Sequence, residues 1–413
     1  MKSKYTPEEI REMMYGLDTP VIGDKPAINL DNAATTPPFK AVIEEINEKL
    51  CWYGSIGRGV GHKSSYSSEV YEKGREIVKE FVGINRKSEE FKDYSVIYIN
   101  HTTEGMNKLA SALIEHECRK FSVITTRMEH HANDLPWRER LGADRILFAD
   151  VDEKGRLKIG DIERLLQENK DVKYVTVTAA SNVTGYVNDV HRIAAIVHKN
   201  GARIIVDGAQ LVAHREFNIL RNPKSMSTDP EAKIDFFLFS AHKMYSPFGG
   251  GAIIGLNEVL DKHIPCSYGG AMVKSVYDYN IDYSLSPDLY ETGSPNYPGV
   301  VGMLKAMEIL KDIGFDYIQD HEQRLMKKTI DELKKIPGVR LYGDNDDYSD
   351  RVGILVFNID RRLDSNVAQL LADQSAIAVR HAKFCSHPYV ARLLGKTGFS
   401  SSLEVDNSCL QNG

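Results

Sequence analysis

The chain has 413 residues, of which 42% are hydrophobic and 27% are charged, and its formal net charge is −6. This composition is ordinary for a globular protein with a large core, so we expect two or three domains that need neither a disulfide nor a metal for stability. The mixed and slightly acidic charge argues against a nucleic acid or an anionic membrane as partner.

Helices are the first elements that the sequence predicts. Residues 6–16 form an amphipathic segment with Thr6 as N-cap and with Glu8 and Glu9 in its first turn, which is typical of a helix start. Longer helices are predicted at residues 39–52 and 66–82.

From residue 95 onward, β-rich runs alternate with helical patterns. Strands that alternate with helices predict a mostly parallel sheet with helices on both faces, so the expected fold class is α/β. The predicted strands are 95–99, 122–126, 145–148, 174–178, 202–207, 236–240 and 252–254, and the predicted helices are 103–117, 159–168 and 189–199.

The pattern changes near residue 300. Two predicted helices at 300–313 and 315–335 precede predicted strands at 338–342 and 352–357 and a helix at 365–374. We therefore expect a large domain at residues 26–295 and a smaller α+β domain made of residues 1–25 and 296–395. The polar tail at 396–413 is expected to be irregular.

The cysteines and the N-terminus indicate the cellular compartment. The five cysteines lie far apart and form no CxxC pair, which favours a reducing compartment over a disulfide framework. The N-terminal segment is charged and lacks the apolar stretch of a secretory signal, and no apolar run approaches the roughly 20 residues that span a bilayer. We expect a cytoplasmic protein without a membrane partner.

The segment FSAHKMYSPFGGG at residues 239–251 carries a candidate nucleophile, Lys243. A lysine that forms a Schiff base must be partly desolvated so that its amine can lose a proton, and the end of a buried strand is such a place. Ser240 and His242 add short donors that suit a phosphate. The alternative interpretation is a surface lysine that follows a strand.

Asp207 follows the apolar run at residues 204–206 and is expected at the C-terminal end of a buried parallel strand. Open α/β sheets bind ligands at that edge. An acid there suits pyridoxal 5'-phosphate (PLP), whose pyridine nitrogen needs a carboxylate to stay protonated. The alternative is a helix N-cap, since Gln210 follows three residues later.

Three further segments carry candidate site residues. NHTTEGMN (100–107) places Thr102 and Thr103 at a helix start, where they form an anion site or only cap the helix. RMEHHAND (127–134) places His130 after a strand, where its ring stacks on a cofactor or has no special role. In VRHAKFCSHP (379–388), nearby cations such as Arg380 favour the nucleophilic thiolate of Cys385, which is otherwise an ordinary small residue.

In their order along the chain, these segments resemble the class V aminotransferase family of PLP enzymes, in its cysteine desulfurase/selenocysteine lyase branch. The resemblance runs from about Ala27 to about Leu394. It rests on LDNAATTPP (30–38), TTEGMN (102–107), MEHHAN (128–133), SNVTG (181–185), VDGAQ (206–210), FSAHKMYSPFG (239–249), YETGSPN (290–296) and an Arg-x4-Cys element ending at Cys385. It implies the fold-type I PLP architecture and a homodimer with active sites at the subunit interface.

The resemblance also implies a role for each candidate residue. Lys243 would be the Schiff-base lysine, Asp207 would pair with the pyridine nitrogen, and Gln210 would reach the ring hydroxyl oxygen. His130 would stack on the ring, so Lys243, His130 and Cys385 are the predicted catalytic residues. The phosphate would be held by Thr102, Thr103, Ser240, His242 and, from the other subunit, Ser294.

Three residues are predicted to face the substrate. Asn182 would contact the ring oxygen or the substrate carboxylate, and Arg58 matches a family arginine at the entrance of the site. Arg380 is also assigned to the substrate. No residue is assigned to a metal.

Cys385 resembles the persulfide-forming cysteine of the second desulfurase group, in which an arginine lies five residues before the cysteine. The predicted reaction takes sulfur from L-cysteine, leaves a persulfide on Cys385 and releases alanine, with Lys243 moving the α-proton. An acceptor protein would then receive the sulfur. The alternatives are a selenocysteine lyase, an aminotransferase or an epimerase of class V, or a catalytically impaired PLP-fold protein.

The chain departs from the family pattern in two places. Ala382, Lys383 and Phe384 replace the Gly-His-His-like run before the cysteine. The Arg-x-Ser segment that usually follows, whose arginine clamps the substrate carboxylate, is not found after Leu394, and Arg392 is too close to the cysteine to match. The second departure predicts weaker substrate binding.

Overall fold

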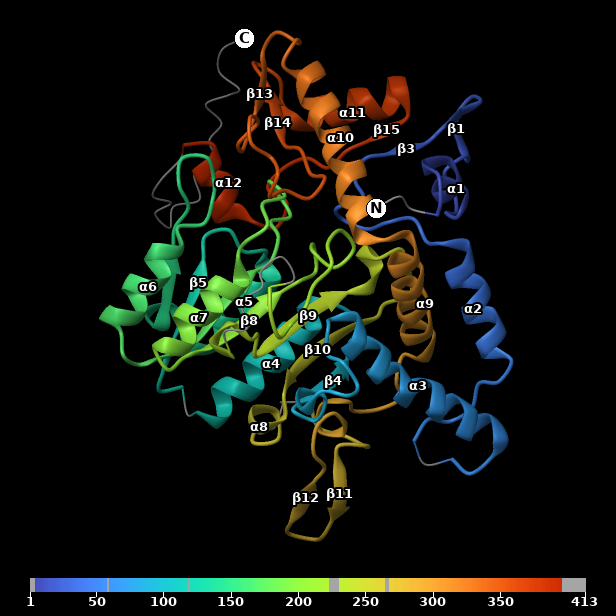
Figure 1. Cartoon of the computed structure of the whole chain (residues 1–413), viewed down its shortest axis with the longest axis vertical. Helices are drawn as coiled ribbons and strands as arrows, with labels where there is room; N and C mark the ends of the chain where they lie inside the picture. Colours follow the sequence, from blue (N-terminus) through green and yellow to red (C-terminus); the bar gives the residue numbers. More distant parts are fainter. Residues whose placement is uncertain (1–3, 58, 118, 223–229, 264–266, 396–413) are drawn as a thin grey trace.

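A central sheet organises the computed structural model, which describes residues 4–57, 59–117, 119–222, 230–263 and 267–395. The sheet has seven strands in the order β4-β10-β9-β8-β7-β5-β6 (Figure 1). Every neighbouring pair from β9 to β6 is parallel, whereas β10 runs antiparallel to both β4 and β9. The strands are β4 (Tyr94–Tyr98), β5 (Ser122–Thr126), β6 (Ile146–Ala149), β7 (Val172–Thr178), β8 (Arg203–Asp207), β9 (Phe236–Ser240) and β10 (Gly251–Leu256).

Side chains of the central strands alternate between two hydrophobic cores, one on each face of the sheet. In β9, Phe236 and Leu238 belong to the core beneath α4, α5 and α8, whereas Phe237 and Phe239 belong to the core beneath α2, α3, α6, α7 and α9. Strands buried on both faces are continuous apolar runs, so the predicted α/β class is confirmed. The helices are α2 (Lys40–Leu50), α3 (His62–Phe81), α4 (Thr102–His116), α5 (His131–Leu141), α6 (Ile159–Glu168), α7 (Val190–Lys199), α8 (Asn257–Leu260) and α9 (Tyr297–Ile313).

A smaller region at one end of the sheet combines early and late segments of the chain (Figure 1). Here β13 pairs antiparallel with β14, and β15 pairs in parallel with β3 in the register Ile377↔Ile28. The domain boundaries at residues 26 and 295 stay a prediction. The elements are α1 (Pro7–Glu12), β1 (Pro20–Ile22), β2 (Lys25–Pro26), β3 (Ile28–Asn29), α10 (Phe315–Leu333), β13 (Val339–Leu341), β14 (Phe357–Ile359), α11 (Asp364–Ser375), β15 (Ile377–Ala378) and α12 (His387–Leu393).

The strand predicted at residues 352–357 is wrong, because β14 begins only at Phe357. The backbone before it is engaged elsewhere. The N–H of Val352 donates to the carbonyl of Gly185 at 2.8 Å, and the buried guanidinium of Arg351 donates to the carbonyl of Ile354 at 2.9 Å. The first contact ties the segment to the loop after β7 instead of to a strand.

A two-stranded hairpin of β11 (Val273–Val276) and β12 (Ile281–Tyr283) projects from the far end of the molecule (Figure 1). Among the helices of the described ranges, none is long and apolar enough to cross a bilayer.

Candidate active site

A pocket of about 1390 Å³ lies where β8 and β9 end and where residues 379–385 approach the sheet. It brings together most of the residues that were assigned to a site from the sequence. Those that line it are Thr102, Thr103, His130, Asn182, Asp207, Gln210, Ser240, His242, Lys243, Arg380 and Cys385. Ser294 is exposed and does not line the pocket of its own chain, and Arg58 lies outside the described residues.

Lys243 and Asp207 face the pocket from neighbouring strand ends. Lys243 ends a short 3-10 turn directly after β9, and its Nζ donates to Oε1 of the buried Gln210 at 3.1 Å. Burial lowers the pKa of Lys243, while the charge of Asp207 acts in the opposite direction. Burial thus favours the neutral, nucleophilic form of the amine, which is the form that a Schiff base requires.

Asp207 is the last residue of β8 and is only 4% exposed. Its Oδ1 accepts the N–H of Ala209 at 2.9 Å, and burial raises the pKa of the carboxyl. A buried carboxylate in this position is stabilised by a cationic partner. A protonated pyridine nitrogen is such a partner, so the residue fits the ring end of PLP.

Hydroxyls and backbone N–H groups gather at the N-terminus of α4. The N–H and the hydroxyl of Thr102 each lie 2.8 Å from Oγ of Ser240, at the end of β9. The helix cap itself is His101, whose Nδ1 accepts the N–H of Glu104 at 3.1 Å, so the alternative in which the threonines only cap the helix is wrong. The exposed Thr103 faces the pocket, and donors at a helix N-terminus suit a phosphate.

His130 is the N-cap of α5, where its Nδ1 accepts the N–H of Ala132 at 3.1 Å. Burial lowers the pKa of His130 to about 4, and the charge of Lys243 adds to this effect. The ring is therefore neutral near pH 7, which suits stacking on an aromatic cofactor. The hydrogen bond also fixes the orientation of the ring.

Behind His130 lies Glu129, a fully enclosed acid that was not predicted from the sequence. Its oxygens accept from the side chains of Thr126 and Asn133 and from the N–H of Thr178 at 2.6 to 3.0 Å. Burial raises the pKa of Glu129 to about 8. By joining β5, β7 and α5, this acid fixes the turn that presents His130.

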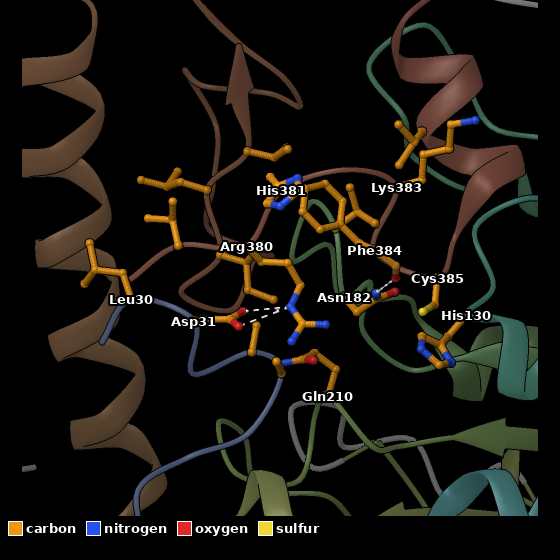
Figure 2. Close-up of a pocket in the computed structure, with 18 of the residues that line it drawn as sticks. Leu30, Asp31, His130, Asn182, Gln210, Arg380, His381, Lys383, Phe384 and Cys385 are labelled. Atoms are coloured by element: carbon orange, nitrogen blue, oxygen red, sulfur yellow. Dashed lines mark hydrogen bonds and ion pairs between the residues drawn. The ribbon is translucent and has the colours of Figure 1, made fainter. Parts of the chain in front are cut away.

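Cys385 lies on an irregular segment that hangs over the pocket (Figure 2). The thiol is exposed, and the backbone of Ala382, Phe384 and Cys385 has φ of 75°, 51° and 53°, in the left-handed region. Asn182 fixes this segment, since its Nδ2 donates to the carbonyl of Phe384 at 2.8 Å and its Oδ1 accepts from Ser386 at 3.0 Å. The carbonyl of Cys385 also accepts the N–H of His131 at 2.7 Å.

These contacts place the Cys385 sulfur so that it points down toward His130, whereas His381 and Lys383 lie higher on the segment (Figure 2). The thiol therefore faces the same pocket as Lys243. Asn182 is assigned to the ring or the substrate by resemblance, and that role stays a prediction. The hydrogen bonds give it a second role, holding the segment that carries the cysteine.

Arg380 reaches into the pocket and pairs with an acid that was not singled out from the sequence. Its Nε lies 3.0 and 3.2 Å from the two carboxylate oxygens of Asp31 (Figure 2). Within the described residues, Arg380 is the one arginine that lines the pocket. Arg392, which lies too close to the cysteine to match the family arginine, instead pairs with Asp150.

A lysine and a buried acid at neighbouring strand ends, together with a helix N-terminus rich in donors, form an α/β site whose residues suit PLP. The chain matches the aminotransferase class-V family over residues 28–409. It belongs to this family, and its relatives place it in the cysteine desulfurase branch.

Two curated relatives illustrate the match. A probable cysteine desulfurase of Halalkalibacterium halodurans is 32% identical over 384 residues, which cover 92% of this chain and 89% of the relative. A cysteine desulfurase of Haloferax volcanii is 33% identical over 368 residues, which cover 88% and 82%.

Solved structures agree with this assignment. The apo structure of a cysteine desulfurase from Thermococcus onnurineus NA1 superposes with a TM-score of 0.81 at 27% identity, covering 96% of this chain and 92% of that one. A cysteine desulfurase from Escherichia coli in its S-sulfonic acid form gives a TM-score of 0.76 at 26% identity, with coverage of 95% and 92%.

Proposed function

We propose that this enzyme is a PLP-dependent cysteine desulfurase that converts L-cysteine to alanine and keeps the sulfur as a persulfide on Cys385. The observation that carries the proposal is that the exposed thiol of Cys385 and the buried amine of Lys243 line one pocket. Class V enzymes that move no sulfur have no need of this thiol.

The residues present suit PLP as the cofactor. Asp207 would hold the pyridine nitrogen, His130 would stack on the ring, and Lys243 would hold the cofactor covalently. Hydroxyls and N–H groups at the start of α4, with Ser240 and His242, would hold the phosphate. When bound, PLP supplies an electron sink next to the α-carbon of the substrate.

Two side chains then act on the substrate. Burial lowers the pKa of Lys243, which makes it easier for Nζ to lose its proton and then take the proton from the α-carbon. The thiolate of Cys385 attacks the substrate sulfur, so the carbon–sulfur bond breaks as the sulfur–sulfur bond forms. Alanine leaves after the carbon skeleton has been reprotonated.

Arg380 would bind the substrate carboxylate. Its ion pair with Asp31 holds the guanidinium in the pocket, where it is 51% exposed. A guanidinium can bind a carboxylate through two parallel hydrogen bonds. The substrate would then compete with Asp31, and this competition would lower the apparent affinity for L-cysteine.

The proposal also covers the oligomeric state and the cellular location of the enzyme. We propose a cytoplasmic homodimer in which Ser294 of each chain reaches the phosphate site of the other, since Ser294 is exposed and outside its own pocket. The exposed position of Cys385 would also let an acceptor protein reach the persulfide.

The test compares Cys385 with Cys51, the two exposed cysteines of the described ranges. The holoenzyme is incubated with L-cysteine, alanine is quantified, and the mass of the intact protein is measured before and after a reducing thiol is added. Cys385→Ser is expected to lose the added sulfur, whereas the control Cys51→Ser keeps it. Full sulfur transfer by Cys385→Ser would contradict the proposal.

A further inference from the structure

Two histidines and a glutamate meet at the end of α4 opposite to the pocket. His116 is the last residue of α4, Glu117 is its C-cap, and His263 follows α8. Since the 15 residues of α4 rise by about 1.5 Å each, the cluster lies roughly 20 Å from Thr102. Figure 1 shows this end of α4 near α8, on the side of the molecule away from β13 and β14.

His263 has the geometry of a metal ligand. It is 4% exposed, and its Nδ1 forms a hydrogen bond with the carbonyl oxygen of Val259. A carbonyl can only accept, so Nδ1 carries the hydrogen and the neutral ring keeps a lone pair on Nε2. Nε2 is buried and has no hydrogen-bond partner among the described residues. An unsatisfied buried acceptor needs an explanation, and a bound ion supplies one.

His116 and Glu117 complete a three-ligand set around this nitrogen. The ring centroids of His116 and His263 are 4.4 Å apart, and the ligand atoms of all three residues lie within 4.8 Å of one another. Lys173 pairs with Oε2 of Glu117, which orients the carboxylate and leaves it a second oxygen for an ion. The negative end of the α4 dipole also favours a cation here.

We propose that His116, Glu117 and His263 bind one divalent transition-metal ion, with Zn²⁺ as the best match. Two imidazole nitrogens and one carboxylate oxygen are a zinc-type set, whereas Mg²⁺ and Ca²⁺ prefer oxygen ligands. Tetrahedral bonds of about 2.1 Å put ligand atoms about 3.4 Å apart, so atoms that now lie within 4.8 Å of one another close by up to about 1.4 Å on binding. His116 is exposed and can make that movement.

The bound ion would join the end of α4 to the segment after α8. No step of the proposed reaction passes through it, because the cluster lies at the opposite end of α4 from Lys243. No metal was predicted from the sequence, since residues 116, 117 and 263 show no metal-binding spacing. Only the fold brings them together.

The test titrates the full-length holoprotein with ZnCl₂ by calorimetry and compares variants. His116→Ala and Glu117→Gln are the main changes, because both side chains reach solvent and their loss spares the core. Glu115→Gln, an exposed acid at the same end of the helix, is the matched control. Because exposed thiols such as those of Cys51 and Cys385 can also bind Zn²⁺, the readout is the difference in equivalents bound between variants.

The wild type and Glu115→Gln are expected to bind one equivalent of Zn²⁺ that His116→Ala and Glu117→Gln lose or bind at least about tenfold more weakly. A hundredfold excess of Mg²⁺ is expected not to displace this equivalent. Equal stoichiometry and affinity in the wild type and His116→Ala would overturn the proposal. Displacement by Mg²⁺ would overturn the assigned class of ion. Far-ultraviolet circular dichroism verifies that each variant is folded.

Discussion

The floor of the pocket and the segment that carries Cys385 hold their side chains by different means. On the floor, Asp207 and Ser240 are the last residues of buried parallel strands, and Lys243 follows three residues after Ser240. The segment at 380–386 has no helix or strand, and it relies on left-handed backbone and a few hydrogen bonds. The sheet thus fixes the groups proposed to hold the cofactor, whereas the segment would let the thiol reach both the substrate and the proposed acceptor.

The largest effect is expected from Lys243→Ala, at the floor of the pocket. Because Lys243 would both hold the cofactor and move the α-proton, alanine formation is expected to fall by at least about 10³-fold. The absorbance band of covalently held PLP is expected to disappear with it. Lys274→Ala, on an exposed strand, is the control. If Lys243→Ala retained the band, another residue would have to hold the cofactor covalently.

Arg380→Gln tests the segment and is expected to act on substrate binding. Losing hydrogen bonds to a charged group costs about 1.5–3 kcal/mol, so KM for L-cysteine should rise about 10- to 100-fold while the PLP band stays unchanged. The matched change Asp31→Asn removes the competitor and is expected to lower KM. Arg362→Gln, on the exposed surface, controls for the loss of charge. A raised KM in Asp31→Asn would argue against the competition.

Asn182→Ala sharpens the comparison by loosening the segment without touching its cysteine. Two hydrogen bonds are lost, each worth about 0.5–1.5 kcal/mol, and the persulfide on Cys385 is expected to form about tenfold more slowly. Rapid mixing followed by mass measurement gives this rate. If only KM changed, Asn182 would act on the substrate instead of on the segment.

The smallest expected effect is on the free energy of unfolding at acidic pH, through His242 at the floor of the pocket. Burial lowers the pKa of His242 to about 4, whereas an unfolded histidine has a pKa near 6.5. The unfolded chain therefore binds more protons between these values, and the free energy of unfolding falls as the pH drops from about 6.5 to 4. His242→Gln is expected to reduce that slope by up to about 1.4 kcal/mol per pH unit, less where solvent screens the half-buried ring.

Urea denaturation of the apoprotein at several pH values checks this slope. His62→Gln, at an exposed position, should leave it unchanged. An equal slope in the wild type and His242→Gln would mean that the histidine titrates alike in both states.

The same contrast explains how much the sequence could predict. The floor was predictable because apolar runs at 204–206 and 236–239 mark buried strands, and chemically useful residues follow each directly. Helix α5 was missed because it contains Pro136 and buries polar residues such as Asn133 and Asp134, so it lacks an amphipathic pattern. The partners Asp31 and Glu129 were missed because only tertiary contacts give them a role.

The parallel pairing of β3 with β15 has a consequence for the timing of assembly. The register that aligns Ile28 with Ile377 and Asn29 with Ala378 continues beyond the strands, where Asp31 meets Arg380. These residues are 349 positions apart in the chain. Contacts of such separation close late, because the entropy of a long loop is lost before they form. On the ribosome, the floor of the pocket can therefore form before Arg380, the residue proposed to bind the substrate, is in place. A nascent chain would then hold cofactor before it could turn over cysteine.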